Sequence, residues 1–105
     1  AALGATGQRY AGPMRPVKRI GLCGGAGAGD MLLALERGCD TYVTADVKHH
    51  EFIAANELGI NLIDGGHFST ENVVVPVLAG WLREDFPGLD VRISERCVQP
   101  ERFFV

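Results

Sequence analysis

The chain has 105 residues, a formal net charge of −3 and 47% apolar residues, which fits one globular domain and excludes a disordered chain. Its longest apolar stretch, Val73–Ala79, contains Pro76 and is far too short to span a membrane. The mildly acidic charge disfavours a nucleic-acid partner. The three cysteines show no paired spacing, which favours free thiols in a reducing cytoplasm.

The first 16 residues are rich in Gly, Ala and Pro and predict an irregular arm, or the remnant of a connection to a missing amino-terminal half. The chain opens with AALGATG, without an initiator Met or a signal pattern. We therefore expect Ala1 to be a trimmed or cleaved end of something longer. Residues 17–105 are expected to form one α/β half-domain.

Strands and helices alternate from Val17 onward. Alternating or apolar runs predict four strands, at residues 17–23, 41–44, 60–63 and 89–93. Helical spacing predicts three helices, at residues 31–37, 47–58 and 71–86, with Asp30, Asp46 and either Ser69 or Thr70 as their N-caps. Pro76 falls inside the third helix and predicts a kink there.

This alternation predicts a doubly wound, mainly parallel sheet with helices on both faces, which is a three-layer α/β/α fold. In such sheets, ligands bind beyond the carboxyl ends of the strands. Three predicted loops reach that edge, at residues 24–29, 45–50 and 64–71. All three histidines of the chain, His49, His50 and His67, lie in or beside these loops. We therefore expect the functional site at this edge.

A glycine-rich turn, CGGAGAGD at residues 23–30, joins the first predicted strand to the first helix. Such turns can bind phosphate because free backbone N–H groups point outward, and one hypothesis is a phosphate- or nucleotide-binding module that uses Gly24–Gly29. The run lacks both the GxGxxG frame and the Lys-Ser/Thr of a Walker loop. A tight turn that needs positive φ angles is the simpler explanation.

The run DVKHHE, residues 46–51, opens the second predicted helix. Adjacent helical residues point about 100° apart, so we expect only one of His49 and His50 to face the site. Asp46 has a sufficient role as a helix cap, and Lys48 as a surface residue. Taken alone, the segment leaves a catalytic or metal-binding role open.

The run DGGHFSTE, residues 64–71, places His67 four residues before Glu71. If His67 precedes the third helix and Glu71 lies in its first turn, the two side chains can converge on one point. An imidazole nitrogen and a carboxylate oxygen suit Zn²⁺, Mn²⁺ or Fe²⁺. A helix-capping loop would use the same residue types, although Gly65-Gly66 leaves room for a group to approach. Two ligands cannot complete a zinc site, which takes three or four.

The runs CGGAGAGD, TADVKHHE and NLIDGGHFSTE, in this order and spacing, resemble the carboxyl-terminal part of the NGG-interacting-factor-three-like family. Its members are also known as GTP cyclohydrolase one type two homologues or dinuclear metal-centre proteins. The resemblance covers residues 6–95. It implies that His67 and Glu71 are metal ligands, and it places Asp46, Lys48 and His50 near the same centre as catalytic candidates.

The resemblance further implies two divalent ions per full-length subunit (zinc, manganese or iron) and a homohexameric ring. The family's amino-terminal half supplies the other ligands and is absent from this chain. We therefore expect the carboxyl-terminal part of a metal-dependent, cyclohydrolase-like hydrolase of a nucleotide-like or other small substrate, with the missing half as its partner. The alternatives are the phosphate-binding module described above and a ring-forming regulatory interaction protein without catalysis.

Overall fold

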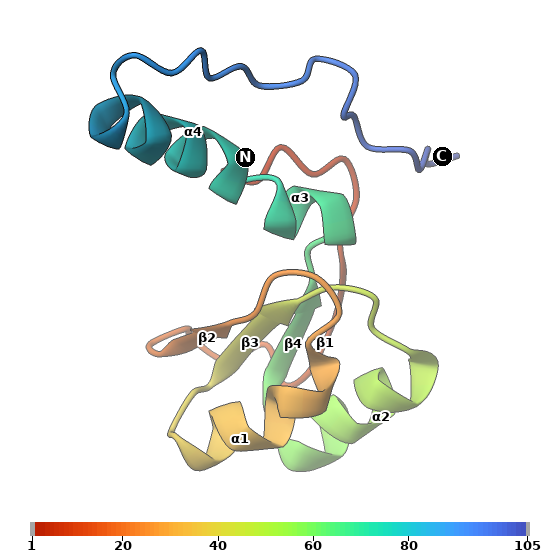
Figure 1. Ribbon diagram of the computed structural model, residues 1–105. Coiled ribbons are helices and arrows are strands. Elements are labelled where there is room, and N and C mark those ends of the chain that lie inside the picture. Colours follow the sequence, from red (N-terminus) through yellow and green to blue (C-terminus); the bar gives the residue numbers. More distant parts are fainter. Residues whose placement is uncertain (1, 105) are drawn as a thin grey trace.

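The centre of the molecule is a mixed four-stranded sheet, seen in a computed structural model that describes residues 2–104 (Figure 1). The strands are β1 (Arg9–Ala11), β2 (Ile20–Leu22), β3 (Thr41–Thr44) and β4 (Asn61–Asp64). They lie in the order β1-β4-β3-β2. Strands β2, β3 and β4 are parallel, and β1 is antiparallel to β4. This arrangement confirms the predicted α/β class with a mainly parallel sheet.

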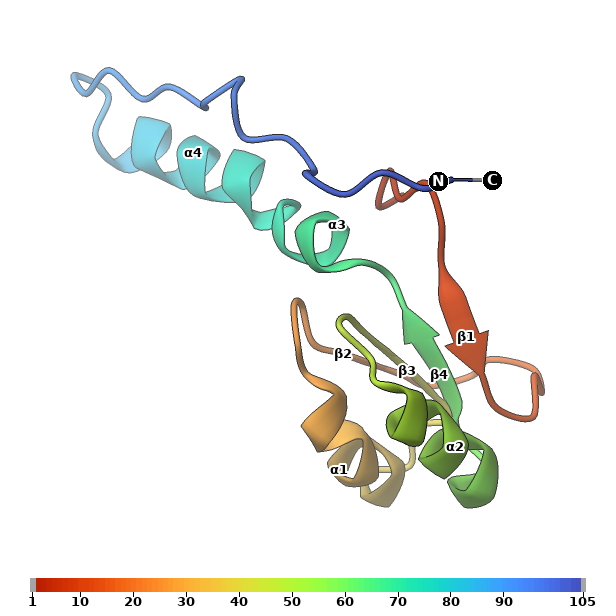
Figure 2. The same ribbon diagram turned by 90° about the vertical axis from the view of Figure 1, so that its right-hand side faces the viewer.

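Helices follow each of the parallel strands. A short 3₁₀ turn (Ala28–Asp30) and α1 (Met31–Glu36) follow β2, α2 (His49–Leu58) follows β3, and α3 (His67–Glu71) and α4 (Val74–Asp85) follow β4. Helices α1 and α2 lie together against the sheet, whereas α3 lies beyond the carboxyl end of β4 and α4 extends away from it (Figures 1 and 2). Within residues 2–104, none of these helices has the length and apolarity needed to cross a membrane.

The core lies between the sheet and the helices α1 and α2. Its buried members are Ala28, Met31, Tyr42, Val47, Ala55, Ile60 and Leu62. The Tyr42 hydroxyl donates a 2.7 Å hydrogen bond to the carbonyl oxygen of Gly27. Burial raises the pKa of Tyr42 to about 12. The protonated phenol therefore ties the glycine-rich turn to the core at any physiological pH.

One edge of the sheet differs from the prediction. Leu89–Ile93 is not a strand; it belongs to an extended segment that returns beside α4 (Figures 1 and 2). The edge position beside β4 is filled by β1, from the segment that was predicted to be irregular, with Arg9 opposite Asp64. Strand β1 has only three residues and lies between Gly7 and Gly12. A run this short shows no alternation of apolar and polar residues from which a strand could be predicted.

The predicted N-caps Asp30 and Asp46 have different outcomes. Asp30 occupies the N-cap position of α1 as predicted, but its side chain makes no capping hydrogen bond. Asp46 does not cap α2, which begins at His49, two residues later than predicted. The first turn of α2 is instead closed by Glu51, whose carboxylate accepts a 2.7 Å hydrogen bond from the backbone N–H of Lys48. The Asp46 carboxylate is thereby left for another partner.

The third predicted helix is two helices, α3 and α4, and it starts earlier than predicted. Gly66 has φ +85°, which turns the chain directly into α3 at His67. Thr70 therefore lies inside α3, where its hydroxyl donates to the carbonyl oxygen of Gly66 at 2.9 Å. Pro76 lies in the first turn of α4, where a missing N–H costs little, and the break between α3 and α4 falls at residues 72–73, just before it, where a proline interrupts a helix.

Large apolar side chains remain exposed on two surfaces. On the face of the sheet shared by Tyr10, Ile20 and Leu22, Leu22 is 76% exposed. Along α4, helical spacing places a second set on one exposed stripe: Val74, Val77, Leu78, Trp81 and Leu82. Contiguous apolar surface of this kind marks an interaction site or an aggregation liability.

The isolated 105-residue chain is therefore expected to self-associate, or to co-purify with a chain that covers these surfaces. Light scattering should give a mass at least twice that of one chain. Replacing Leu78 and Trp81 together by Glu should lower that mass, because both side chains lie on the exposed stripe of α4. A monodisperse, highly soluble monomer of the unaltered chain would contradict the expectation.

Candidate metal centre

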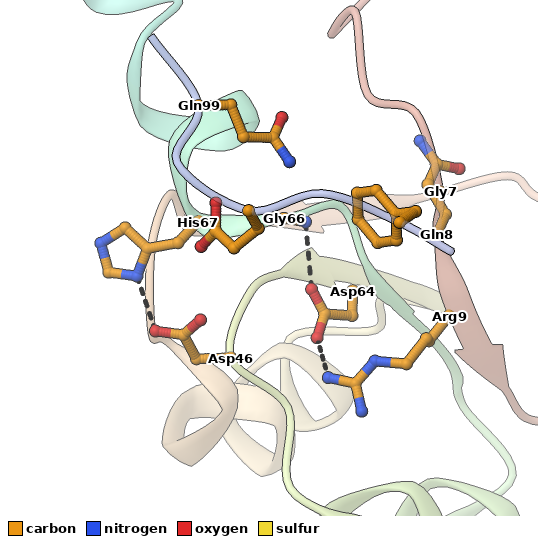
Figure 3. Close-up of a pocket in the computed structure, with 10 residues that line it drawn as sticks. Gly7, Gln8, Arg9, Asp46, Asp64, Gly66, His67 and Gln99 are labelled. Atoms are coloured by element: carbon orange, nitrogen blue, oxygen red, sulfur yellow. Dashed lines mark hydrogen bonds and ion pairs between the residues drawn. The ribbon is translucent and has the colours of Figure 1, made fainter. Parts of the chain in front are cut away.

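The predicted site forms where the carboxyl ends of β3 and β4 meet α3. Asp46 follows β3, His67 is the first residue of α3, and Glu71 is the last. Figure 3 shows the His67 ring and the Asp46 carboxylate facing each other at this edge of the sheet. Both residues line a cavity of about 350 Å³. The sequence-based expectation that His67 and Glu71 converge is consistent with this geometry, although α3 begins one turn earlier than expected.

His67 contacts an acidic side chain through each of its ring nitrogens. Its Nδ1 lies 2.6 Å from Oδ2 of Asp46, and its Nε2 lies 3.2 Å from Oε2 of Glu71. An ionised carboxylate can only accept hydrogen bonds, so Nδ1–H donates to Asp46. In the neutral imidazole, Nε2 then carries a lone pair that faces the lone pairs of Glu71. Two electron-pair donors so close together require a cation between them, either a proton or a metal ion.

In the absence of a metal, the proton fills this role. The pKa of His67 is raised above its ordinary value of 6.5, first by the hydrogen bond to Asp46, then by the charge of Asp46 and that of Glu71. Because the folded-state pKa is raised, the stability that protonated His67 contributes is fully present below pH 6.5 and is lost as the pH rises through the folded-state value.

Replacing Asp46 by Asn should lower the pKa of His67 in the metal-free chain. The substitution removes the largest cause of the raised value and leaves Glu71 in place. An NMR titration of the His67 ring should show a larger decrease for Asp46→Asn than for Glu71→Gln. The exposed Asp90→Asn variant is the control and should leave the titration unchanged. An unaltered His67 pKa in Asp46→Asn would contradict the assigned hydrogen bond.

Gly25 shapes the space in front of the two donors. Its φ of +67° is a left-handed conformation that favours glycine, and a Cβ atom built there would overlap Oε1 of Glu71 and lie 3.3 Å from Nε2 of His67. The loop is held in place by two hydrogen bonds: Gly25 N–H donates to Oγ1 of Thr70 at 2.9 Å, and Ala45 N–H donates to the Gly25 carbonyl at 2.8 Å. The glycine-rich turn thus leaves room for an ion between His67 and Glu71.

The same hydrogen bonds bear on the phosphate-binding hypothesis for Gly24–Gly29. The N–H of Gly25 donates to Thr70, and the N–H of Gly27 donates to Oγ1 of Thr44 at 2.9 Å, so neither points at a bound anion. Helix α1, which follows the turn, has only six residues. These observations favour a structural role for the glycines.

Asp64 holds the two site loops together. Its side chain is only 8% exposed, and it accepts hydrogen bonds from the backbone N–H groups of Val47 at 3.1 Å and Gly66 at 3.0 Å. It also forms an ion pair with Arg9, drawn in Figure 3, and Arg9 donates to the Val47 carbonyl at 3.0 Å. Sequence reasoning treated Asp64 only as a turn residue and missed Arg9. The one signal available for Asp64 was its position directly after the predicted strand at residues 60–63.

Lys48 and His50 lie outside this arrangement. Both are exposed at the start of α2, and neither lines the two cavities that His67 lines. Among residues 2–104, no group of three or more His, Cys, Asp and Glu side chains is placed to hold a metal ion. Asp46 cannot join His67 and Glu71 as a third ligand because it binds the opposite ring nitrogen. This part of the chain therefore offers two ligands, Nε2 of His67 and the Glu71 carboxylate.

The sequence pattern of Duf34/NIF3 (NGG1p interacting factor 3) matches residues 1–101. The chain belongs to this family. Curated relatives are named GTP cyclohydrolase 1 type 2 homolog: one from Haemophilus influenzae is 34% identical over 75% of this chain and 31% of its own length, and one from Staphylococcus aureus strain COL is 34% identical over 83% and 25%. The chain thus spans about a third or less of these Duf34/NIF3 relatives.

Solved structures of the Duf34/NIF3 family share the fold. A Staphylococcus aureus protein is 31% identical, with a TM-score of 0.81. The match covers 97% of this chain and 34% of the Staphylococcus aureus chain. A Bacillus cereus protein related to NIF3 is 26% identical with a TM-score of 0.77, over 97% of this chain and 29% of its own. The match along nearly the whole chain confirms the resemblance drawn from the three motifs.

Proposed function

We propose that this chain is the carboxyl-terminal part of a cytoplasmic, dinuclear metal-binding hydrolase of a nucleotide-like or other small substrate. One observation carries the proposal. Nε2 of His67 and Oε2 of Glu71 lie 3.2 Å apart while Nδ1 is bound to Asp46, so two electron-pair donors face one space that Gly25 leaves open. Imidazole nitrogen and carboxylate oxygen are ligands of Zn²⁺, Mn²⁺ and Fe²⁺.

In this proposal, each candidate site residue has a defined role. His67 and Glu71 hold metal, and Glu71 has a second oxygen with which a carboxylate can bridge two ions. Asp46 fixes the tautomer and the orientation of the imidazole. When bound, a pair of divalent ions supplies an activated water for hydrolysis. Lys48 and His50 would contact substrate only across a cleft completed by other parts of the full-length protein.

The size of the relatives supports a division of the centre. This chain spans about a third or less of their length, so the remaining ligands have room elsewhere in a full-length subunit. The relatives' name refers to a GTP cyclohydrolase and is the basis for a nucleotide-like substrate. The exposed apolar surfaces on the sheet and on α4 are the surfaces that a missing half or the neighbouring subunits of a homohexameric ring would cover.

Elemental analysis of the full-length protein tests the proposal. We expect about two ions of zinc, manganese or iron per subunit, as two-metal sites hold. The 105-residue chain alone should bind metal weakly because it supplies two ligands. A full-length protein that is purified without chelators and takes up none of these metals on dialysis would contradict the proposal.

A further inference from the structure

The carboxyl-terminal residues 97–103, termed the strap, lie against the metal-centre edge of the molecule. The strap returns from the far end of α4 toward the amino-terminal arm (Figures 1 and 2). Ser69 of α3 donates a 3.4 Å hydrogen bond to Oε1 of Gln99. Further along, the Phe103 ring packs on Gly7 so closely that a Cβ atom there would lie 3.2 Å from two ring carbons. The strap is thus attached on both sides of the site.

Two cavities flank the strap, and His67 and Glu101 line both. Gln99, Glu101 and Phe103 line the cavity of about 350 Å³ that also contains Asp46. Glu101 also lines the neighbouring cavity of about 430 Å³, which Glu71 lines as well. Both volumes fall in the usual range for small-molecule sites. The strap therefore forms part of the wall of both cavities that His67 lines.

Glu101 has no other task among the residues that the structure describes. No hydrogen bond or ion pair occupies its carboxylate within that part of the chain, and no metal-binding group of three includes it. The other charges in its cavity are already engaged: Arg9 is paired with Asp64, and His67 with Asp46. Its carboxylate can therefore accept N–H groups from a bound molecule, whereas an anionic group would be repelled there.

We infer, on the basis of the proposed function, that the strap selects the substrate of the metal centre: Glu101 accepts hydrogen bonds from adjacent N–H donors of a flat heterocycle, and Phe103 contacts the face of its ring. A carboxylate fits two neighbouring N–H groups because it has two acceptor oxygens. An aromatic ring adds a stacking contact that any flat ring can make. Glu101 and Phe103 are thus specificity residues that take no part in holding metal.

Calorimetric titration of the full-length protein with guanosine and with purine riboside tests this inference. The two probes share the sugar and a purine ring, but only guanosine presents adjacent N–H donors. We expect the unaltered protein to bind guanosine at least about 10-fold more tightly, the effect of a charge-assisted hydrogen bond. Glu101→Gln should remove this preference, and Phe103→Leu should weaken both probes. The control Glu95→Gln, an exposed carboxylate outside the strap, should change neither.

Metal content, measured on the same samples, separates this inference from the proposed function. Unchanged metal content in Glu101→Gln, together with loss of the guanosine preference, supports the role of the strap. Equal or undetectable binding of the two probes by the unaltered protein would overturn it, and so would a loss of metal in Glu101→Gln. If the unaltered protein holds no metal but still prefers guanosine, the proposed function is contradicted and the role of the strap in substrate selection is supported.

Discussion

Replacing His67 or Glu71 by Ala in the full-length protein should lower its metal affinity by at least about 10-fold, since loss of a ligand costs no less than loss of a residue that supports one. Each variant removes one of the two donors that face each other 3.2 Å apart. Elemental analysis after dialysis against a weak chelator measures the effect. Neither variant should unfold the protein, because both side chains are substantially exposed.

His49→Ala is the matched control for these two variants. His49 is an exposed histidine at the start of α2 and lines neither cavity beside His67. Its replacement should leave the metal content within error of the unaltered protein. Full metal content in both His67→Ala and Glu71→Ala would contradict the assignment of these two residues as ligands. The glycines before α3 and the helix itself would then have only a structural role.

Replacing Asp64 by Ala should reduce the free energy of unfolding by about 2–4 kcal/mol, because two backbone N–H groups, those of Val47 and Gly66, lose their acceptor at about 1–3 kcal/mol each. The ion pair with Arg9 adds little, since Arg9 is largely exposed. A loss of this size is a large share of the stability of a small domain. Urea unfolding of the full-length protein, followed by circular dichroism, measures it.

Asp90→Ala is the matched control, since Asp90 also pairs with an arginine, Arg92, but at an exposed position. Its free energy of unfolding should change by less than about 0.5 kcal/mol. Equal effects of the two substitutions would show that Asp64 does not hold the site loops together. If Asp64 does hold them, Asp64→Ala should also weaken metal binding, because it releases the loops that carry Asp46 and His67.

The parallel part of the fold could be predicted because local sequence and tertiary structure agree there. Thr41–Thr44 is a strand with the predicted bounds, and Gly38 and Gly59 end the helices before and after it in left-handed conformations. The edge strand could not be predicted from local pattern. Whether residues 9–11 or residues 89–93 pair with β4 depends on where the chain returns after α4.

The two candidate ligands, His67 and Glu71, could be predicted from the sequence, but the contacts that position them could not. The spacing of His67 and Glu71 places them one helical turn apart, which was sufficient to pair them. From the residues alone, Asp46 was assigned to a helix cap because Asp before a helical run usually caps it, and only the family resemblance placed it near the centre. Its positive φ of +52° and its 21-residue separation from His67 are tertiary features that no local pattern contains. The same holds for Arg9, which reaches Asp64 across 55 residues.

The most direct test of the account is a crystal structure of the full-length protein with anomalous diffraction recorded at the absorption edges of zinc, manganese and iron. The account predicts anomalous peaks within bonding distance of Nε2 of His67 and the carboxylate of Glu71, with Nδ1 of His67 still bound to Asp46. Peaks elsewhere in the protein, with His67 and Glu71 linked only by a hydrogen bond, would contradict the assignment of this edge of the sheet as a metal centre.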